Sequence, residues 1–503
     1  MLNNKISEPG DSSKPSIADE LIFLANIEYE VIRTQENDFL AIPLSGPKIV
    51  KPLLGMGNTL ADDLMRKYRD TRRKLPSERA VKDAIRVLVS EASAKNPVQV
   101  HLRFAQIGNE IFVDLGDETG QAIQIARGTW QIIDNPPVIF RRTALTAPFP
   151  RPKVGGDFSK LFSIINIPKE QEGLVLGFII SAYFESIPHP IIALNGEQGS
   201  GKSGTAKRLV SLIDPSPAAL QSPPKDLMAW IELAAGSYAI SLDNLSKLND
   251  WLSDSLCRAS TGDSLVKRQH YSDKDLIVHK FKRVIILNGI NLTILRDDLA
   301  DRIIPISLPV ITSHDRKYEA DLEDDWANAF SEIFGGILSL CAKVLEGYEM
   351  VELAELPRMA DFARILRAID VVRGTDSLPA YLDEIGKMAS NTIDGENFFK
   401  ILQKLIPASW TGTAAELLDL VNPALPFSVD KTWPTTAREV TEKLTRTSPT
   451  LRKVGWNISD LGSNNEHKTK RWCITPPTGV TGVTGEVFTL YTKDKGKENN
   501  AAS

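Results

Sequence analysis

Cysteine and long apolar runs are scarce in this sequence. Only three of its 503 residues are cysteines, Cys257, Cys341 and Cys473, so neither a disulfide framework nor a four-ligand zinc site is indicated. A reducing, cytoplasmic setting is therefore predicted. The longest apolar run, Leu174–Phe184, is shorter than the ~20 residues of a membrane-spanning helix. We expect it to form a buried helix, and we expect no membrane partner.

Positive charge is not in excess either. The chain has 59 Lys and Arg against 64 Asp and Glu, a net charge of -5. This argues against a uniformly basic surface that coats nucleic acid, so any contact with DNA must be regional. The start of the chain, MLNNKISEPGDSSKPS, lacks the basic residues and apolar run of a secretory signal. With 42% hydrophobic and 24% charged residues, the composition is that of a soluble globular protein with several domains.

The first third of the chain has the pattern of an α+β domain. Residues 1–20 are polar and predict a disordered tail. Between residues 21 and 150, apolar spacing predicts a helix over Glu78–Ala94, and alternating segments then predict a β-meander over residues 98–133. Three prolines and two glycines in residues 146–156 predict a linker into the next domain.

The remainder divides into four parts. Residues 151–312 alternate short apolar runs with helical stretches, which predicts a parallel α/β nucleotide-binding core. Its five candidate strands are IIALNG, AALQS, YAISLDN, VIILNG and IIPISL. Residues 313–404 predict a helical connector or lid. Residues 405–476 predict a small domain with helices near 413–421, 436–446 and 449–455 and a final strand, RWCITPP. Residues 477–503 are repetitive and polar and predict a second disordered tail.

A phosphate-binding loop is the clearest motif. Residues 196–203, GEQGSGKS, fit the pattern G-x-x-x-x-G-K-[ST] between a predicted strand and a predicted helix. Glycines let successive backbone N–H groups close on phosphate oxygens. Lys202 is expected to neutralise the β and γ phosphates and Ser203 to hold Mg²⁺, so ATP and Mg²⁺ are the predicted cofactors. The alternative is a glycine-rich turn without a ligand. The predicted nucleotide contacts are Gly196, Glu197, Gln198, Gly199, Ser200, Gly201, Lys202, Ser203 and Gly204.

Three further polar residues stand at strand boundaries. Asp243 ends the strand YAISLDN and is a candidate second Mg²⁺ ligand beside Ser203. Asn288 ends VIILNG, where its side chain could contact the γ-phosphate or the attacking water. Arg302 directly precedes IIPISL and is a candidate arginine finger for a neighbouring subunit. Taken singly, each could instead be purely structural.

The order GEQGSGKS, YAISLDN, VIILNG and DLADRIIPISL resembles the AAA+ core of superfamily III helicases and related ATPases of phages and mobile elements. The resemblance implies catalytic roles for Lys202, Asp243, Asn288 and Arg302, and a homo-hexameric ring in which each finger completes its neighbour's site. The family usually has a second acidic residue after the Walker B aspartate, where this chain has Asn244. Asn244 could orient water but could not accept its proton. Glu197 and Glu232 are alternative carboxylates.

Two regions are candidates for DNA contact. Between Asp243 and Asn288 the sequence predicts a β-hairpin with its turn at residues 272–275. In superfamily III helicases an insertion here grips single-stranded DNA. The candidate cations and polar groups are Lys267, Arg268, His270 and Lys274. Because Asp273 and Asp275 flank Lys274, a merely solvated hairpin is the alternative.

Residues 405–476 resemble the winged-helix domains appended to phage primase-helicases, which implies duplex DNA binding or protein docking. The cations expected on or beside its recognition helix and wing are Arg438, Lys443, Arg446, Arg452, Lys453, Lys468, Lys470 and Arg471.

The leading functional prediction is an ATP-driven helicase or translocase on single-stranded or forked DNA, working with a primase or another replication protein. An ATP-switched scaffold or loader that does not unwind DNA is the main alternative. A defence NTPase is a third hypothesis, but the sequence has no recognisable effector domain to support it. Primase activity is not supported, because Asp114 and Asp117 are three residues apart and would face opposite sides of a strand.

Overall fold

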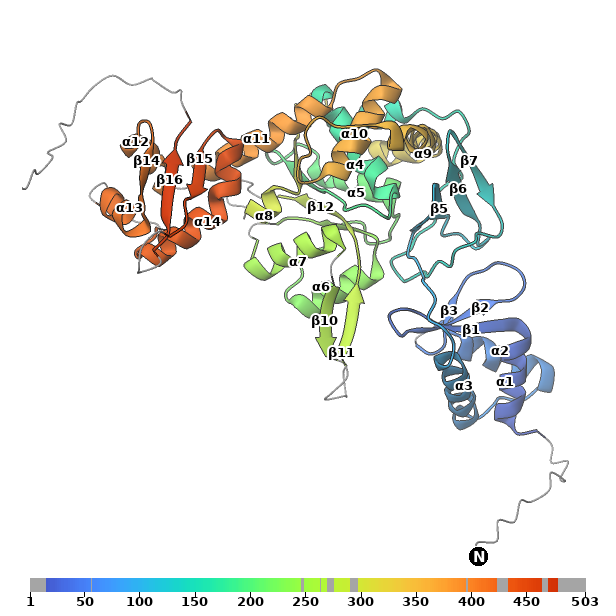
Figure 1. The fold of residues 1–503 in the computed structure, drawn as a ribbon. Coiled ribbons are helices and arrows are strands. Elements are labelled where there is room, and N and C mark those ends of the chain that lie inside the picture. The colour runs from blue at the N-terminus through green and yellow to red at the C-terminus, as the bar shows by residue number, and fades with distance from the viewer. Residues whose placement is uncertain are drawn as a thin grey trace, which may run out of the picture. The chain divides into compact units, whose positions relative to one another are not determined.

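The computed structural model describes residues 15–55, 57–245, 248–262, 264–268, 276–289, 297–394, 397–422, 433–463 and 469–477. Residues 1–14 and 478–503, most of both predicted tails, lie outside these ranges. The chain forms two compact units, Met1–Thr392 and Ile393–Ser503, and each is described by itself (Figure 1).

The first unit begins with a small α+β domain that has its own hydrophobic core. Its first helix starts at Ile17, inside the predicted tail, because Ser16 and Asp19 form a capping box there. Leu21, Leu64 and Ile85 are among the side chains buried in the core. Its elements are α1 (Ile17–Glu28), β1 (Tyr29–Arg33), β2 (Phe39–Pro43), β3 (Lys51–Pro52), α2 (Leu60–Arg72) and α3 (Glu78–Ser93).

The predicted β-meander follows as a four-stranded antiparallel sheet. Its strands are β4 (Phe104–Ile107), β5 (Glu110–Asp114), β6 (Ala122–Ala126) and β7 (Thr129–Ile133), hydrogen-bonded in that order. Phe104, Ile111 and Ile123 lie in the same hydrophobic cluster as the helices of the central region. The predicted boundary near residue 150 therefore does not separate two cores, because the meander shares the core that follows it.

The predicted linker, residues 146–156, is packed rather than free. Phe149 stacks on Phe334 with ring centroids 4.5 Å apart, and Lys153 N–H donates to the Ser331 carbonyl at 2.9 Å. A Cβ at Gly156 would collide with the Glu332 carbonyl. The prolines and glycines of this segment thus let its backbone lie directly on the helix α9 (Glu319–Gly347).

The central region contains a four-stranded parallel sheet with the order β13-β8-β12-β9. Its strands are β8 (Ile191–Asn195), β9 (Ala239–Leu242), β12 (Val284–Asn288) and β13 (Ile303–Ser307). These correspond to four of the five predicted strands. The fifth prediction, AALQS, is wrong as a strand, because only Gln221 forms a single parallel bridge, to Leu242 at the edge of the sheet.

Helices cover both faces of this sheet, as its continuously apolar strands predict. Ile192 and Leu194 pack on one face with α4 (Glu172–Tyr183), α5 (Lys202–Ile213), α9 and α10 (Ala360–Arg373). Ile191 and Ala193 pack on the other with α6 (Leu227–Gly236), α7 (Asp250–Thr261) and α8 (Asp297–Ala300). The remaining elements of the first unit are η1 (Phe158–Ser163), η2 (Lys169–Gln171), β10 (Ser264–Arg268), β11 (Leu276–Lys280), η4 (Tyr348–Met350) and α11 (Leu378–Asp394).

Helix α9 is unusually apolar for its length. Among the described residues, Glu319–Met350 is the one helical segment long and apolar enough to cross a membrane, and 61% of its apolar window is buried inside the chain. The core helix of a soluble protein has these properties as well, so the segment is weak support for a membrane span.

The C-terminal unit combines helices with a three-stranded antiparallel sheet of order β14-β16-β15. Its elements are α12 (Asn397–Leu405), β14 (Trp410–Thr413), α13 (Ala414–Val421), α14 (Ala437–Lys453), β15 (Asn457–Asp460) and β16 (Arg471–Thr475). Phe398 and Leu402 of α12 pack into this core, so the predicted connector 313–404 ends earlier than expected. The separate helix predicted near residues 449–455 is wrong, because α14 continues through Pro449.

Candidate functional site

The loop between β8 and α5 is built on glycines that adopt left-handed or related backbone conformations. Gly196, Gly199 and Gly201 have φ values of 147°, 85° and 81°, which L side chains rarely adopt. A Cβ at Gly196 would lie 2.6 Å from the Leu308 carbonyl oxygen. Since α5 begins at Lys202 without a side-chain cap, the first N–H groups of the helix face the loop, as an anion site requires.

Lys202 reaches back across this loop. Its Nζ donates to the carbonyl oxygens of Gly196 and Glu197, at 2.8 Å each. The ammonium group is therefore held at the mouth of the loop, where it adds a full positive charge to the partial charge of the helix terminus.

Ser203, Asp243 and Asn288 converge from three different elements. Ser203 Oγ donates to Asp243 Oδ1 at 3.1 Å, and Asn288 Nδ2 donates to Ser203 Oγ at 3.1 Å and also to Asp243 Oδ1. Asp243 and Asn288 stand at the carboxyl ends of β9 and β12, beside the end of β8 that leads into the loop. Parallel strands end at one edge of their sheet, so the sequence order alone brings these groups together.

The chemistry of this cluster suits a hydrated magnesium ion. A hydroxyl and a carboxylate oxygen are hard ligands, and Mg²⁺ usually keeps waters and phosphate oxygens besides one or two protein ligands. Among the described residues, no group of three or more His, Cys, Asp and Glu side chains is placed to hold a metal by itself. Asn288 Oδ1 is buried and has no hydrogen-bond partner within the described part of the chain, so it can accept a bond from a ligand or water.

The residue after the cluster has a special backbone. Asn244 has φ 55°, and its side chain is exposed. The Asn288 carbonyl accepts the Leu245 N–H at 2.9 Å, which holds the chain beside β12. Glu197 and Glu232, the two alternative carboxylates, are both exposed, and Glu232 lies on α6 before β9.

Arg302 lies at the opposite end of the sheet from the loop. The Ile191 N–H, at the start of β8, donates to the Arg302 carbonyl at 2.8 Å, whereas the loop follows the far end of β8. A five-residue strand spans ~16 Å, so Arg302 cannot reach the loop of its own chain. Its guanidinium donates to the Asp298 carbonyl and contacts Cys257 Sγ at 3.7 Å. Burial raises the pKa of the Cys257 thiol to about 12.

Two residues beside the loop are not predicted by any sequence motif. Asn166 Nδ2 donates to the Ser200 carbonyl at 3.0 Å and to the Pro309 carbonyl at 2.6 Å. Arg316 places a guanidinium nitrogen 3.0 Å from where a Cβ on Gly199 would lie. Neither belongs to a motif, and both are brought to the loop by segments distant in sequence.

The predicted hairpin is present as strands β10 and β11, paired antiparallel. Lys267 pairs with Ile277 and Arg268 with Leu276, so both residues lie at the C-terminal end of β10. The predicted turn, residues 272–275, lies outside the described residues. His270 and Lys274 lie outside the described residues.

The basic residues of the C-terminal unit differ in position. Lys443 is buried, with its Nζ 5.9 Å from the ring centroids of both Phe398 and Phe399, so the expectation that it faces DNA is wrong. Lys470 pairs with Asp460 at 2.8 Å. Lys468 lies outside the described residues. Arg438 is also paired, with Glu442 at 2.9 Å. The predicted DNA-facing cations that are exposed among the described residues are Arg438, Arg446, Arg452, Lys453, Lys470 and Arg471.

Open parallel α/β sheets bind their ligands at the carboxyl edge, which is where the glycine loop and the polar side chains of this sheet lie. Two known protein families match parts of the chain. Residues 158–390 match the family described as the actinomycete integrative conjugative element replication protein, and residues 399–485 match the AICE RepA C-terminal domain. The central and C-terminal parts of the chain are thus similar to replication proteins of mobile elements.

Solved structures give more distant likenesses. The A-form apo structure of the NrS-1 C-terminal region is 16% identical, with a TM-score of 0.41, and the match covers 90% of this chain and 98% of that one. A JCV helicase bound to a small acetamide is 12% identical, with a TM-score of 0.26, over 46% of this chain and 65% of that one. No curated protein matches the chain significantly.

Proposed function

We propose that this protein is an AAA+ ATPase that hydrolyses ATP at the loop of residues 196–204 and uses the energy to move along or unwind DNA during replication of a mobile element. The convergence of Ser203, Asp243 and Asn288 beside the loop carries the proposal. The match of residues 158–390 to a replication-protein family supports the biological setting.

Each group then has a distinct task. The backbone of the loop and the start of α5 bind the phosphates, and Lys202 balances their charge. Ser203 and Asp243 would hold a magnesium ion, which would supply positive charge beside the phosphates. Asn288 orients the γ-phosphate or the attacking water through its amide. Asn244 orients water without accepting a proton.

Arg302 acts between copies of the chain. Because it lies at the amino edge of the sheet, it can stabilise the transferred phosphoryl group only in the site of a neighbouring subunit. A ring, most simply a homo-hexamer, follows from this role.

Two surfaces contact DNA in this proposal. The hairpin β10–β11 contacts single-stranded DNA through Lys267, Arg268, His270 and Lys274. The C-terminal unit acts as a winged helix on duplex DNA or on a replication protein. Its order of elements, helix, strand, two helices and two strands, and the exposed arginines of α14 support this assignment.

One observation favours a second function. Asn244 stands where a translocase of this kind usually has an acidic residue, so slow hydrolysis would suit an ATP-switched scaffold or loader that binds DNA or a replication protein without unwinding.

ATP hydrolysis with and without single-stranded DNA separates the two functions. For the wild type, we expect strong stimulation by single-stranded DNA and unwinding of forked DNA. Weak hydrolysis that DNA does not stimulate would support the scaffold instead.

The variant Lys202→Ala is expected to abolish hydrolysis. Lys207→Ala is the matched control, because it removes a lysine from the same helix, where it only pairs with Glu319 at 3.7 Å. If Lys202→Ala hydrolyses ATP like the control, the nucleotide site has been assigned wrongly.

A further inference from the structure

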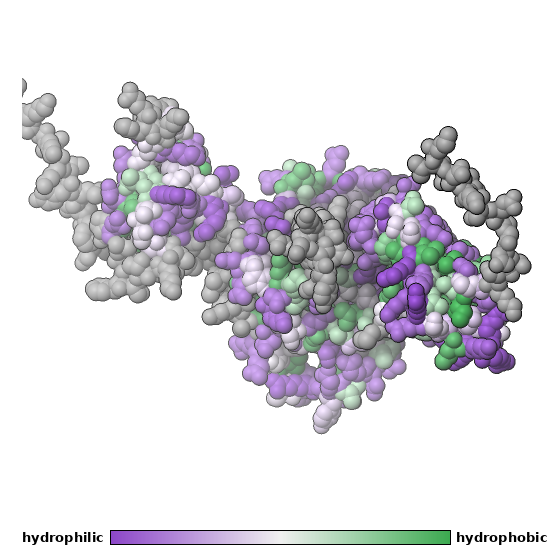
Figure 2. All heavy atoms as spheres, turned by 90° about the horizontal axis from the view of Figure 1, so that it is seen from below, coloured by the Kyte–Doolittle hydropathy of each residue, from purple (hydrophilic) through white to green (hydrophobic). Residues whose placement is uncertain are grey.

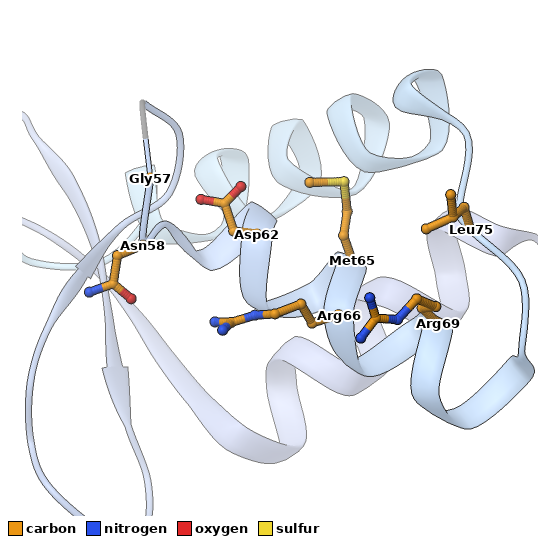
Figure 3. A pocket seen from close by; sticks show the side chains of 7 residues that line it. All are labelled: Gly57, Asn58, Asp62, Met65, Arg66, Arg69 and Leu75. Atoms are coloured by element: carbon orange, nitrogen blue, oxygen red, sulfur yellow. The ribbon is translucent and has the colours of Figure 1, made fainter.

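A cleft on helix α2 of the N-terminal domain combines arginines with apolar side chains. It has a volume of about 480 Å³, within the range of sites for small ligands. Figure 3 shows Arg66 and Arg69 on successive turns of α2, with Met65 beside them and Leu75 on the segment after the helix. Gly57, Asn58 and Asp62 complete the wall.

The local charge is opposite to that of the whole chain. Residues 57–75 contain six Lys and Arg against three Asp, a net charge of +3, whereas the whole chain has -5. In the space-filling view, hydrophilic (purple) and hydrophobic (green) side chains lie next to each other on the N-terminal domain, at the right (Figure 2). A surface of this charge attracts a polyanion.

A buried carboxylate holds one of the arginines in place. Asp63 is buried and accepts hydrogen bonds from Tyr29 Oη at 2.8 Å, from Lys51 Nζ and from Arg66. Two cations share this carboxylate, and Asp62 in the wall of the cleft lies near both of them. Arg69 pairs with Asp70 on the surface at 3.0 Å, and a phosphate can replace such an exposed pair at little cost.

We propose that this cleft binds single-stranded nucleic acid, with phosphates on Arg66 and Arg69 and a base on Met65 and Leu75. Guanidinium groups bind phosphates in a bidentate manner. An unstacked base can cover the apolar wall, whereas the bases of a duplex are held inside the stack. A glutamate or aspartate side chain would satisfy the arginines but leave the apolar wall exposed, so an acidic peptide fits less well.

This proposal is independent of ATP hydrolysis, and binding to the full-length protein without nucleotide tests it. The ligand is a short fluorescent oligothymidylate, and the affinity is measured at several salt concentrations. For Arg66→Ala/Arg69→Ala, we expect weaker binding and a slope of log affinity against log salt that is smaller by about 1.4, since each phosphate contact on a single strand contributes about 0.7.

The matched control is Arg79→Ala/Lys82→Ala. It removes the same charge from exposed positions on α3 of the same domain, and its slope should stay that of the wild type. A second variant, Leu75→Asp, alters an exposed side chain that contributes little to the core. It should weaken binding about fivefold to tenfold by placing a carboxylate beside the phosphates.

Competitors distinguish the sources of the anion. Unlabelled oligothymidylate should displace the probe from the wild type, and thymidine monophosphate should do so only at much higher concentration. Equal losses in the test and control double variants would overturn the proposal, as would displacement by oligoglutamate at the same charge concentration or crosslinks from a photoreactive oligonucleotide that all lie outside residues 57–75.

Discussion

Replacing Arg103 with Met should destabilise the first unit strongly. Arg103 is completely buried just before β4, and its Nε donates to Asp214 Oδ1 at 2.8 Å. Its other nitrogens donate to the carbonyls of Asp114, Ala147 and Pro215 at 3.0 to 3.3 Å. Removing one partner of a buried ion pair leaves an uncompensated charge, at a cost of about 3–5 kcal/mol.

The loss should extend to the nucleotide site. Asp214 directly follows α5, the helix that begins with Lys202. It also accepts the N–H groups of Tyr238 and Ala239, at 2.7 and 3.2 Å, where β9 starts toward Asp243. Arg103 thus fixes the far ends of two elements whose near ends carry the phosphate and metal ligands.

Urea unfolding and hydrogen exchange measure this prediction. A loss of about 3 kcal/mol should speed exchange of the Tyr238 and Ala239 amides by about a hundredfold where exchange depends on unfolding. The control is Arg127→Met, because Arg127 pairs with Glu349 at 2.6 Å on the surface and should contribute less than about 1 kcal/mol. Arg103→Met/Asp214→Asn should recover part of the loss. If Arg103→Met is as stable as the Arg127 control, the reasoning about the buried pair is refuted.

Three further results are expected. Arg302→Ala should bind ATP but not hydrolyse it, and mixed rings with Lys202→Ala should regain some activity; confirmed mixed rings without activity would argue against a shared site. Replacing Lys267, Arg268 and Lys274 together with Ala should leave basal hydrolysis intact but remove DNA stimulation and unwinding, and an unchanged salt dependence of single-strand binding would show the hairpin to be only a solvated turn. Burial lowers the pKa of His189 to about 3, so the unfolded chain binds the extra proton as the pH falls below about 6.5, and stability should fall by up to about 1.4 kcal/mol per pH unit toward pH 3. His189→Gln should lack this component in urea unfolding at graded pH, and parallel pH profiles for both proteins would contradict it.

The centre of the candidate site was accessible from sequence because it is made of local patterns in a fixed order. A glycine loop between strand and helix, and polar residues at the ends of apolar strands, needed only the rule that parallel strands end together. Asn166 and Arg316 were missed because each reaches the loop through contacts between distant segments. No spacing in the sequence encodes such contacts.

Two segments differ from the patterns that their residues predict. The prolines and glycines of residues 146–156 predict a linker, but glycine also permits the close backbone packing on α9 that the segment has. Separate helices are predicted at 436–446 and 449–455, but Leu444 and Leu451 continue one buried stripe, and their packing outweighs the hydrogen bond that Pro449 cannot donate. The same stripe predicts that Lys443 is buried, because Lys443 follows Val440 at helical spacing and is buried with it.

The contact of Gly156 with α9 also governs the order in which the chain can fold during synthesis. About 180 residues separate Gly156 from Gly335 and Gly336, the residues of α9 on which this segment packs. The ribosome must add all of them before the contact can form. At ~5–20 residues per second this delay is on the order of 10–40 s. The β-meander waits equally long, because β6 and β7 also pack on α9. Throughout that interval β6 and β7 lack the helix on which they pack, so a chaperone that binds apolar β-strands should associate with chains arrested before residue 319 and release those extended beyond α9.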